Sequence, residues 1–167
     1  METLKINVND NRLLGLITLF DLHTDFYDRV LDGIPDEAAQ NRLGTKANHI
    51  AWLAGSLLQE RCELVNWFGG DFHQKHRELF DNHKGIQDGL DYPSLEDFKR
   101  DWKKVSPILR DILSALTTEK LDTTFDMEGM KMTNYEYVSF DIYREANCIG
   151  QIALWRRLLG FPAMKYE

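Results

Sequence analysis

The residues with the clearest chemical potential stand close together near the end of the chain. Arg144 and Cys148 are four positions apart, so on a helix they would share a face. A guanidinium beside a thiol can lower the pKa of the thiol and make it a nucleophile. No general base stands next to Cys148 in the sequence, and the residue lies inside an apolar helical pattern. This context favours a structural thiol in a helical core.

A second candidate is a group of histidines in the middle of the chain. Three of the five gather in one segment of mixed polarity: His73, His76 and His83. The spacing of the first two would suit a surface zinc site, but no cysteine accompanies them. Gly85 and Gly89 follow, as is typical of a loop. Solvated histidines in a long connection are the favoured interpretation.

Four long helical patterns must position these side chains. Apolar residues recur at spacings of three and four over residues 11–31, 45–68, 94–116 and 133–159. Capping boxes at Ser94 and Thr133 begin the third and fourth patterns. His23 lies in the first pattern beside its apolar face, which predicts a hydrogen-bonded histidine at the edge of the core.

The connections between the patterns complete the predicted architecture. Residues 71–93 indicate a long connection with one short helix, and residues 121–127 could lie extended, although clear alternating strands are absent. The sequence therefore predicts one all-α domain over residues 1–167. We expect a four-helix bundle with a long crossover connection that contains a short extra helix.

The composition limits the classes of partner. The chain has 167 residues, 43% of them hydrophobic, and a net charge of -7, which opposes a role in binding nucleic acid. No apolar stretch is long enough to cross a membrane, and the start of the chain lacks the features of a signal peptide. Cys62 and Cys148 lie in apolar helical patterns and are expected to be reduced thiols. These features predict a cytoplasmic protein.

Three segments resemble the DinB-like family, also called the DinB/YfiT-like putative metalloenzymes. The matching segments are NHIAWLAGSL from Asn48, DYPSLED from Asp91 and IGQIALWRRLLG from Ile149. The resemblance extends from the first helix to Gly160 and implies a four-helix bundle that forms a homodimer. Many members bind a divalent metal through one histidine of the second helix and two histidines, four apart, of the last. Relatives include hydrolases and thiol transferases.

The positions that the resemblance assigns to the metal ligands carry other residues here. They are Ser56, Arg144 and Cys148, and none is histidine. A guanidinium is permanently charged and has no lone pair for a cation. We therefore expect a degenerate metal site and no cofactor. The alternative is a metal-dependent hydrolase or thiol transferase that holds zinc, nickel or manganese through non-standard ligands.

Several roles for the inner cleft stay open at this stage. His49 and Cys148, with Glu60 or Asp141, could supply a different ligand set. Arg144 could instead form an ion pair with Asp141 or with an acid on a facing helix. A third role is binding of a small anionic ligand by a group of cleft residues: Ser56, His49, Arg144 and Gln151. A helical interaction module that binds a partner chain is a further alternative.

Overall fold

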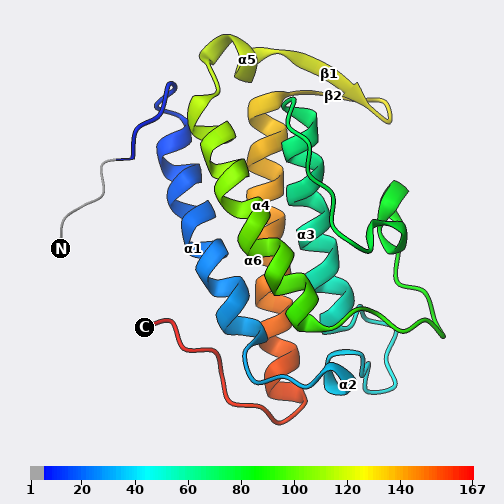
Figure 1. The fold of residues 1–167 in the computed structure, drawn as a ribbon. Helices are drawn as coiled ribbons and strands as arrows, with labels where there is room; N and C mark the ends of the chain where they lie inside the picture. Colours follow the sequence, from blue (N-terminus) through cyan, green and yellow to red (C-terminus); the bar gives the residue numbers. More distant parts are fainter. Residues whose placement is uncertain (1–5) are drawn as a thin grey trace.

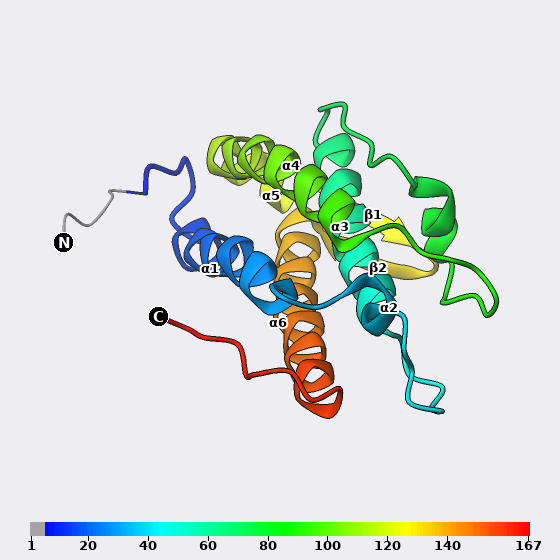
Figure 2. The same cartoon turned by 60° about the horizontal axis from the view of Figure 1, so that its bottom comes forward.

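The computed structural model describes residues 6–167 and is mostly helical, with one small antiparallel sheet. Its four long helices are α1 (Leu13–Leu31), α3 (Ile50–Trp67), α4 (Leu95–Ala115) and α6 (Asn134–Leu158). Helices α1 and α3 each pack against both α4 and α6. The four helices thus enclose one core, as the two views in Figures 1 and 2 show.

The directions of α3 and α4 require a long connection between these two helices. In Figure 1, α3 and α4 run the same way, so the chain must return along the whole length of the molecule between them. This return segment contains two short 3₁₀ turns, η1 (Arg77–Leu79) and η2 (Asp81–His83). The long crossover is as predicted, but the single short helix is wrong. Asn82 and His83 have positive φ angles of 58° and 55°, which interrupt any regular helix there.

The predicted helix starts are largely confirmed by their caps. The Thr133 hydroxyl accepts from the backbone N–H of Glu136, and the Glu136 carboxylate accepts from the N–H of Thr133, so this capping box is complete. The Ser94 hydroxyl accepts from the N–H of Asp97. Helix α3 begins at Ile50, five residues later than predicted, because the His49 ring caps it by accepting from the N–H of Trp52.

A β-hairpin stands where no clear strands were predicted. Strands β1 (Thr124–Met127) and β2 (Met130–Thr133) pair antiparallel, with Met127 opposite Met130. Both turn residues, Glu128 and Gly129, have positive φ angles, as a tight two-residue hairpin turn of type I′ requires. The expected extended segment over residues 121–127 is correct only from Thr124, because α5 (Thr118–Asp122) precedes it. A short helix, α2 (Asp36–Ala39), lies at the other end of the molecule (Figure 1).

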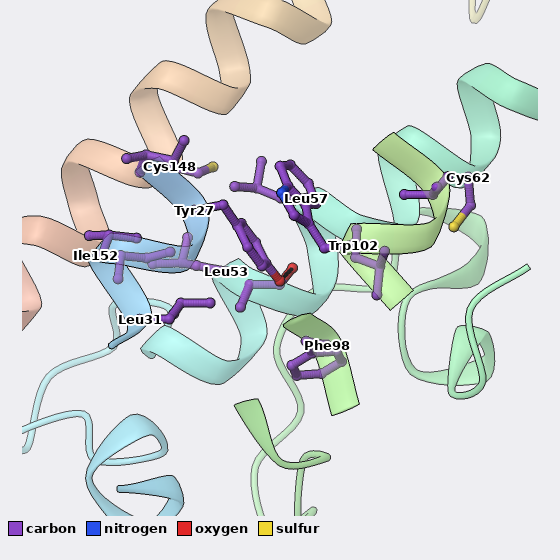
Figure 3. Packing of buried hydrophobic residues seen from close by; sticks show 14 of the residues in the cluster. Tyr27, Leu31, Leu53, Leu57, Cys62, Phe98, Trp102, Cys148 and Ile152 are labelled. Carbon is purple, nitrogen blue, oxygen red and sulfur yellow. Dashed lines mark hydrogen bonds between the residues drawn. The ribbon is translucent and has the colours of Figure 1, made fainter. Parts of the chain in front are cut away.

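Aromatic and aliphatic side chains from all four long helices fill the core. Tyr27 of α1 stacks on Trp102 of α4 with ring centroids 3.9 Å apart. Figure 3 shows these two rings between the flanking helices, with Cys148 and Cys62 at opposite sides of the drawn cluster. Both cysteines are buried and neither forms a disulfide within the described chain. The reading of both as reduced core thiols agrees with this placement.

Candidate ligand cleft

A cleft of about 570 Å³ opens between α3, α6, the hairpin and the segment around Phe80. Most of its lining surface is apolar. The apolar wall contains four aromatic residues and three methionines: Trp52, Phe80, Tyr137, Phe140, Met127, Met130 and Met132. The polar residues of its floor come from facing turns of α3 and α6: Ser56, Gln59, Glu60, Glu63, Asp141 and Arg144. A mostly apolar cavity with a few convergent polar groups is typical of a small-molecule site.

The hairpin supplies the methionines because of its strand register. Phe125 pairs with Met132 and Met127 pairs with Met130, so these four side chains project from the same face of the ribbon. Phe125 packs against Trp67 of α3, with ring centroids 4.7 Å apart, and this contact holds the face against the helices. Methionine is flexible and polarisable, so this wall can adapt to the shape of a ligand.

Arg144 joins the two helices at the floor of the cleft. Its Nη1 forms an ion pair with the Glu60 carboxylate, and its Nη2 donates a hydrogen bond of 2.9 Å to the Ser56 hydroxyl. The structure therefore pairs Arg144 with an acid on a facing helix, one of the alternatives considered from the sequence. The acid is Glu60, and not Asp141. Because its charge is paired with Glu60, Arg144 is a poor receptor for an external anion.

Asp141 lies beside this ion pair and has a different environment. Its side chain is 6% exposed, and its Oδ2 has no hydrogen-bond partner among residues 6–167. Burial and the neighbouring Glu60 carboxylate raise the pKa of Asp141 well above its usual value. Burial likewise raises the pKa of Glu60 to about 7, although Arg144 opposes that shift. The floor thus favours the neutral, protonated form of these carboxyl groups, because too little positive charge lies beside them.

Two residues expected in the cleft lie elsewhere. His49 stands at the start of α3 against Tyr92, and its Nδ1 is used as the helix cap. Burial lowers the pKa of His49 to about 4, so the ring is neutral at pH 7. Gln151 is exposed and donates to Asn147 one turn earlier on α6. The structure brings neither residue into the cleft, contrary to the expectation.

Cys148 is buried one turn beyond Arg144 and does not line the cleft either. Burial raises the pKa of its thiol to about 11, despite the nearby guanidinium. The thiol is therefore protonated at neutral pH. This environment is that of a structural cysteine and is unsuited to a nucleophile.

The residues at the three family metal positions do not fit a divalent cation. Ser56 and Arg144 are hydrogen-bonded to each other, the Arg144 charge would repel a cation, and the Cys148 thiol is protonated. In the described part of the chain, no three His, Cys, Asp or Glu side chains are grouped so as to hold a metal ion. The absence of a cofactor itself remains a prediction.

The histidines of the long connection do not converge. His73 lies near Asp71, and His76 near Glu78, both with partly exposed side chains. Only His83 reaches the rim of the cleft. The structure thus separates the three residues that were considered as a surface zinc site.

A buried polar network below the cleft was missed from the sequence. Arg61 is 1% exposed, and its guanidinium lies between the Phe20 and Trp102 rings, 3.9 Å and 3.6 Å from their centroids. It donates to both carboxylate oxygens of Glu145, at 2.5 Å and 2.9 Å. His23 contacts the same carboxylate at 3.1 Å.

This network, the Arg61–Glu145–His23 network, connects α1, α3 and α6, and the Ser106 hydroxyl adds α4 by accepting from Arg61. The predicted hydrogen bonding of His23 within the helices is confirmed. Arg61 could have been found from spacing, because it stands four residues after Leu57 and four before Val65 on the buried stripe of α3.

The comparisons with known proteins add no family. Neither the protein-family models nor the curated proteins give a match to this chain. No helix within residues 6–167 has both the length and the apolar character that a bilayer crossing requires. The assignment of function therefore depends on the geometry of the cleft.

Proposed function

We propose that this chain is a small-molecule-binding protein of the DinB/YfiT-like four-helix-bundle type, and that it binds its ligand without a metal. The ligand site is the cleft between α3, α6 and the hairpin. The observation that carries the proposal is an apolar cavity of about 570 Å³ built over a group of charged side chains, of which Asp141 is buried and the others are half-buried. Binding sites for small molecules combine these two properties.

The alternative of a metal-dependent hydrolase or transferase has less support. It needs three or four ligands with free lone pairs, and the Ser56, Arg144 and Cys148 side chains do not supply them. Metal analysis of protein purified without chelator tests this alternative directly. Stoichiometric zinc, nickel or manganese would contradict the proposal.

The proposal includes a homodimer and a cytoplasmic location. Helix α6 presents exposed apolar side chains that share one face by their helical spacing: Phe140, Tyr143, Leu154 and Leu158. Water-exposed apolar faces of this kind commonly mark protein contacts. The two buried, unpaired cysteines fit a reducing compartment.

Dye binding with matched hairpin variants tests the cleft. Met132 projects from the hairpin face that lines the cavity, whereas Thr124 projects from the opposite face. We expect the neutral dye N-phenyl-1-naphthylamine to bind with a gain of fluorescence. Met132→Trp should fill the cavity and weaken binding at least about tenfold, while Thr124→Trp should leave it unchanged. Equal binding by both variants, each shown to be folded, would contradict the proposed site.

A further inference from the structure

We infer that the ligand is an organic cation, an ammonium or amidinium group attached to an apolar body, and that Asp141 receives its charged end. The inference rests on the proposed function, because it names the class of molecule that the same cleft would take. It goes against the small anionic ligand considered from the sequence. Three independent features of the cleft carry it.

The first feature is the charge of the floor. Glu60, Glu63 and Asp141 supply three carboxyl groups, and Arg144 is the one guanidinium set among them. Glu145, just below, does not alter this balance because it is paired with Arg61. The remaining cations of the lining, Lys84 and Lys131, are exposed at the rim, and Lys84 donates to the backbone of Glu78. A positively charged ligand would favour the ionised form of these carboxyl groups, as Arg144 does for Glu60, whereas an anion would oppose it.

The second feature is the unsatisfied oxygen of Asp141. A buried carboxyl group normally has a hydrogen-bond donor, because leaving a buried acceptor unpaired is unfavourable. Asp141 lines the cavity, yet Oδ2 has no donor within residues 6–167. An ammonium group placed in the cavity would donate the missing hydrogen bond and would favour release of the Asp141 proton to solvent, so that the two groups form an ion pair.

The third feature is the chemical composition of the cleft wall. Four aromatic rings and three thioethers surround the space above Asp141: those of Trp52, Phe80, Tyr137, Phe140, Met127, Met130 and Met132. Aromatic faces attract cations as well as apolar groups. A small hydrophilic cation would leave this wall without contacts. The cavity therefore suits an amine with a substantial apolar body.

Calorimetric titration of three probes with the same apolar body tests the inference. The probes are 4-phenylbutylamine, which is cationic, 4-phenylbutan-1-ol, which is neutral, and 4-phenylbutanoate, which is anionic. At pH 7.5 the amine should bind at least about tenfold more tightly than the alcohol, and the carboxylate should bind most weakly. Asp141→Asn should reduce the amine affinity to that of the alcohol and leave the alcohol affinity unchanged.

The matched control is Asp111→Asn, which removes an exposed carboxylate from α4, away from the cleft. It should keep the preference for the amine. Equal affinity of wild-type protein for amine and alcohol would overturn the inference and leave the ligand cleft in place. Tightest binding of the carboxylate would overturn it in favour of an anion at Arg144. If the neutral dye binds and the amine does not, the inference fails alone; if neither binds, the proposed function fails as well.

Discussion

Asp141 and Glu60 are carboxylic acids in surroundings that disfavour their ionised forms. Their carboxyl groups influence each other electrostatically from α3 and α6, and Arg144 is paired with Glu60. Burial raises the pKa of both groups, Glu60 to about 7. Natural proteins often keep such unfavourable groups where a ligand will later satisfy them. Two predictions at the residue scale follow from the buried charges.

The first prediction concerns the pH dependence of the free energy of unfolding. Because the folded-state pKa values of Glu60 and Asp141 exceed their unfolded values, the folded protein holds protons that the unfolded chain releases, and stability must fall as pH rises through those values. His49, with its pKa lowered to about 4, has the opposite effect, but only below about pH 6.5. We therefore expect the free energy of unfolding to decrease between pH 6.5 and 8.5.

Urea unfolding at several pH values measures this effect. Asp141→Asn should stabilise the protein at pH 8.5 by roughly 1–3 kcal/mol and make the pH dependence weaker. Asp111→Asn, the exposed control, should follow the wild-type curve. A wild-type protein that becomes more stable from pH 6.5 to 8.5 would show that these carboxyl groups are not buried as described.

The second prediction at the residue scale concerns the stability that the Arg61–Glu145–His23 network contributes. Arg61→Met leaves the buried Glu145 carboxylate with His23 as its remaining hydrogen-bonding partner and should cost about 3–5 kcal/mol. The double variant Arg61→Met, Glu145→Gln removes the unpaired charge and should recover much of that loss. A double-mutant cycle from urea unfolding gives the coupling. A double variant less stable than Arg61→Met alone would contradict the assigned pairing.

Residue spacing predicted part of the cleft and missed the rest for a geometric reason. Ser56, Asp141 and Arg144 line the cavity as expected, because a helical face can be read from positions in one segment. The partner of Arg144 depends on how α3 is rotated against α6, which no spacing within either segment specifies. His49 was predicted to lie inside a helix that begins near residue 45. Its ring instead caps the N-terminus of α3, which places it outside the cleft.

At the scale of the elements, the approach of the return segment to α3 depends on one glycine. A methyl group at Gly55 would lie 2.2 Å from the Phe80 ring and 2.8 Å from the Phe98 ring. Phe80 also lines the cleft. The absence of a side chain at position 55 thus allows this segment to close the cavity against α3.

Alanine substitution of two helical glycines tests this packing. Gly55→Ala must displace Phe80 or Phe98 and should cost about 1–3 kcal/mol and weaken dye binding. Gly150→Ala is the control, since no described atom lies within 4 Å of the added methyl group on α6, and it should stabilise the protein by up to about 1 kcal/mol. Thermal unfolding compares the two. A Gly55→Ala protein as stable as wild type would mean that Phe80 does not pack there.

The hairpin shows the limit of reading elements from sequence. Each strand has four residues, too few for alternation of apolar and polar residues to stand out. The turn residues Glu128 and Gly129 do not predict a hairpin from sequence, because glutamate rarely takes a positive φ. The cleft wall was therefore not foreseeable, although the long helices were.

At the scale of the whole molecule, the long connection was predictable because a chain with a gap of more than 20 residues between helices can reverse its direction. The return segment then leaves α3 and α4 parallel and covers one side of the helices (Figure 1). The position of that segment depends on side-chain packing across three elements. The same packing makes the segment part of the cavity wall. Such contacts are not encoded in local periodicity.

The proposed homodimer gives a prediction at this scale. Leu154→Glu places a charge among the exposed apolar side chains of α6 and should convert a dimer to a monomer, which light scattering after size-exclusion chromatography measures. Ile108→Glu makes the same change on the exposed side of α4 and should leave the mass unchanged. A monomeric wild-type protein at micromolar concentration would contradict the dimer.

NMR of methionine methyl groups tests whether the cleft is a ligand site. Met127, Met130 and Met132 line the cleft, whereas Met164 is buried near the C-terminus, outside it. In protein labelled with ¹³C at the methionine methyls, titration with 4-phenylbutylamine or the neutral dye should shift the three hairpin signals saturably and leave Met164 in place. Saturable shifts of Met164 alone, or of none of these methyl groups, would contradict the account.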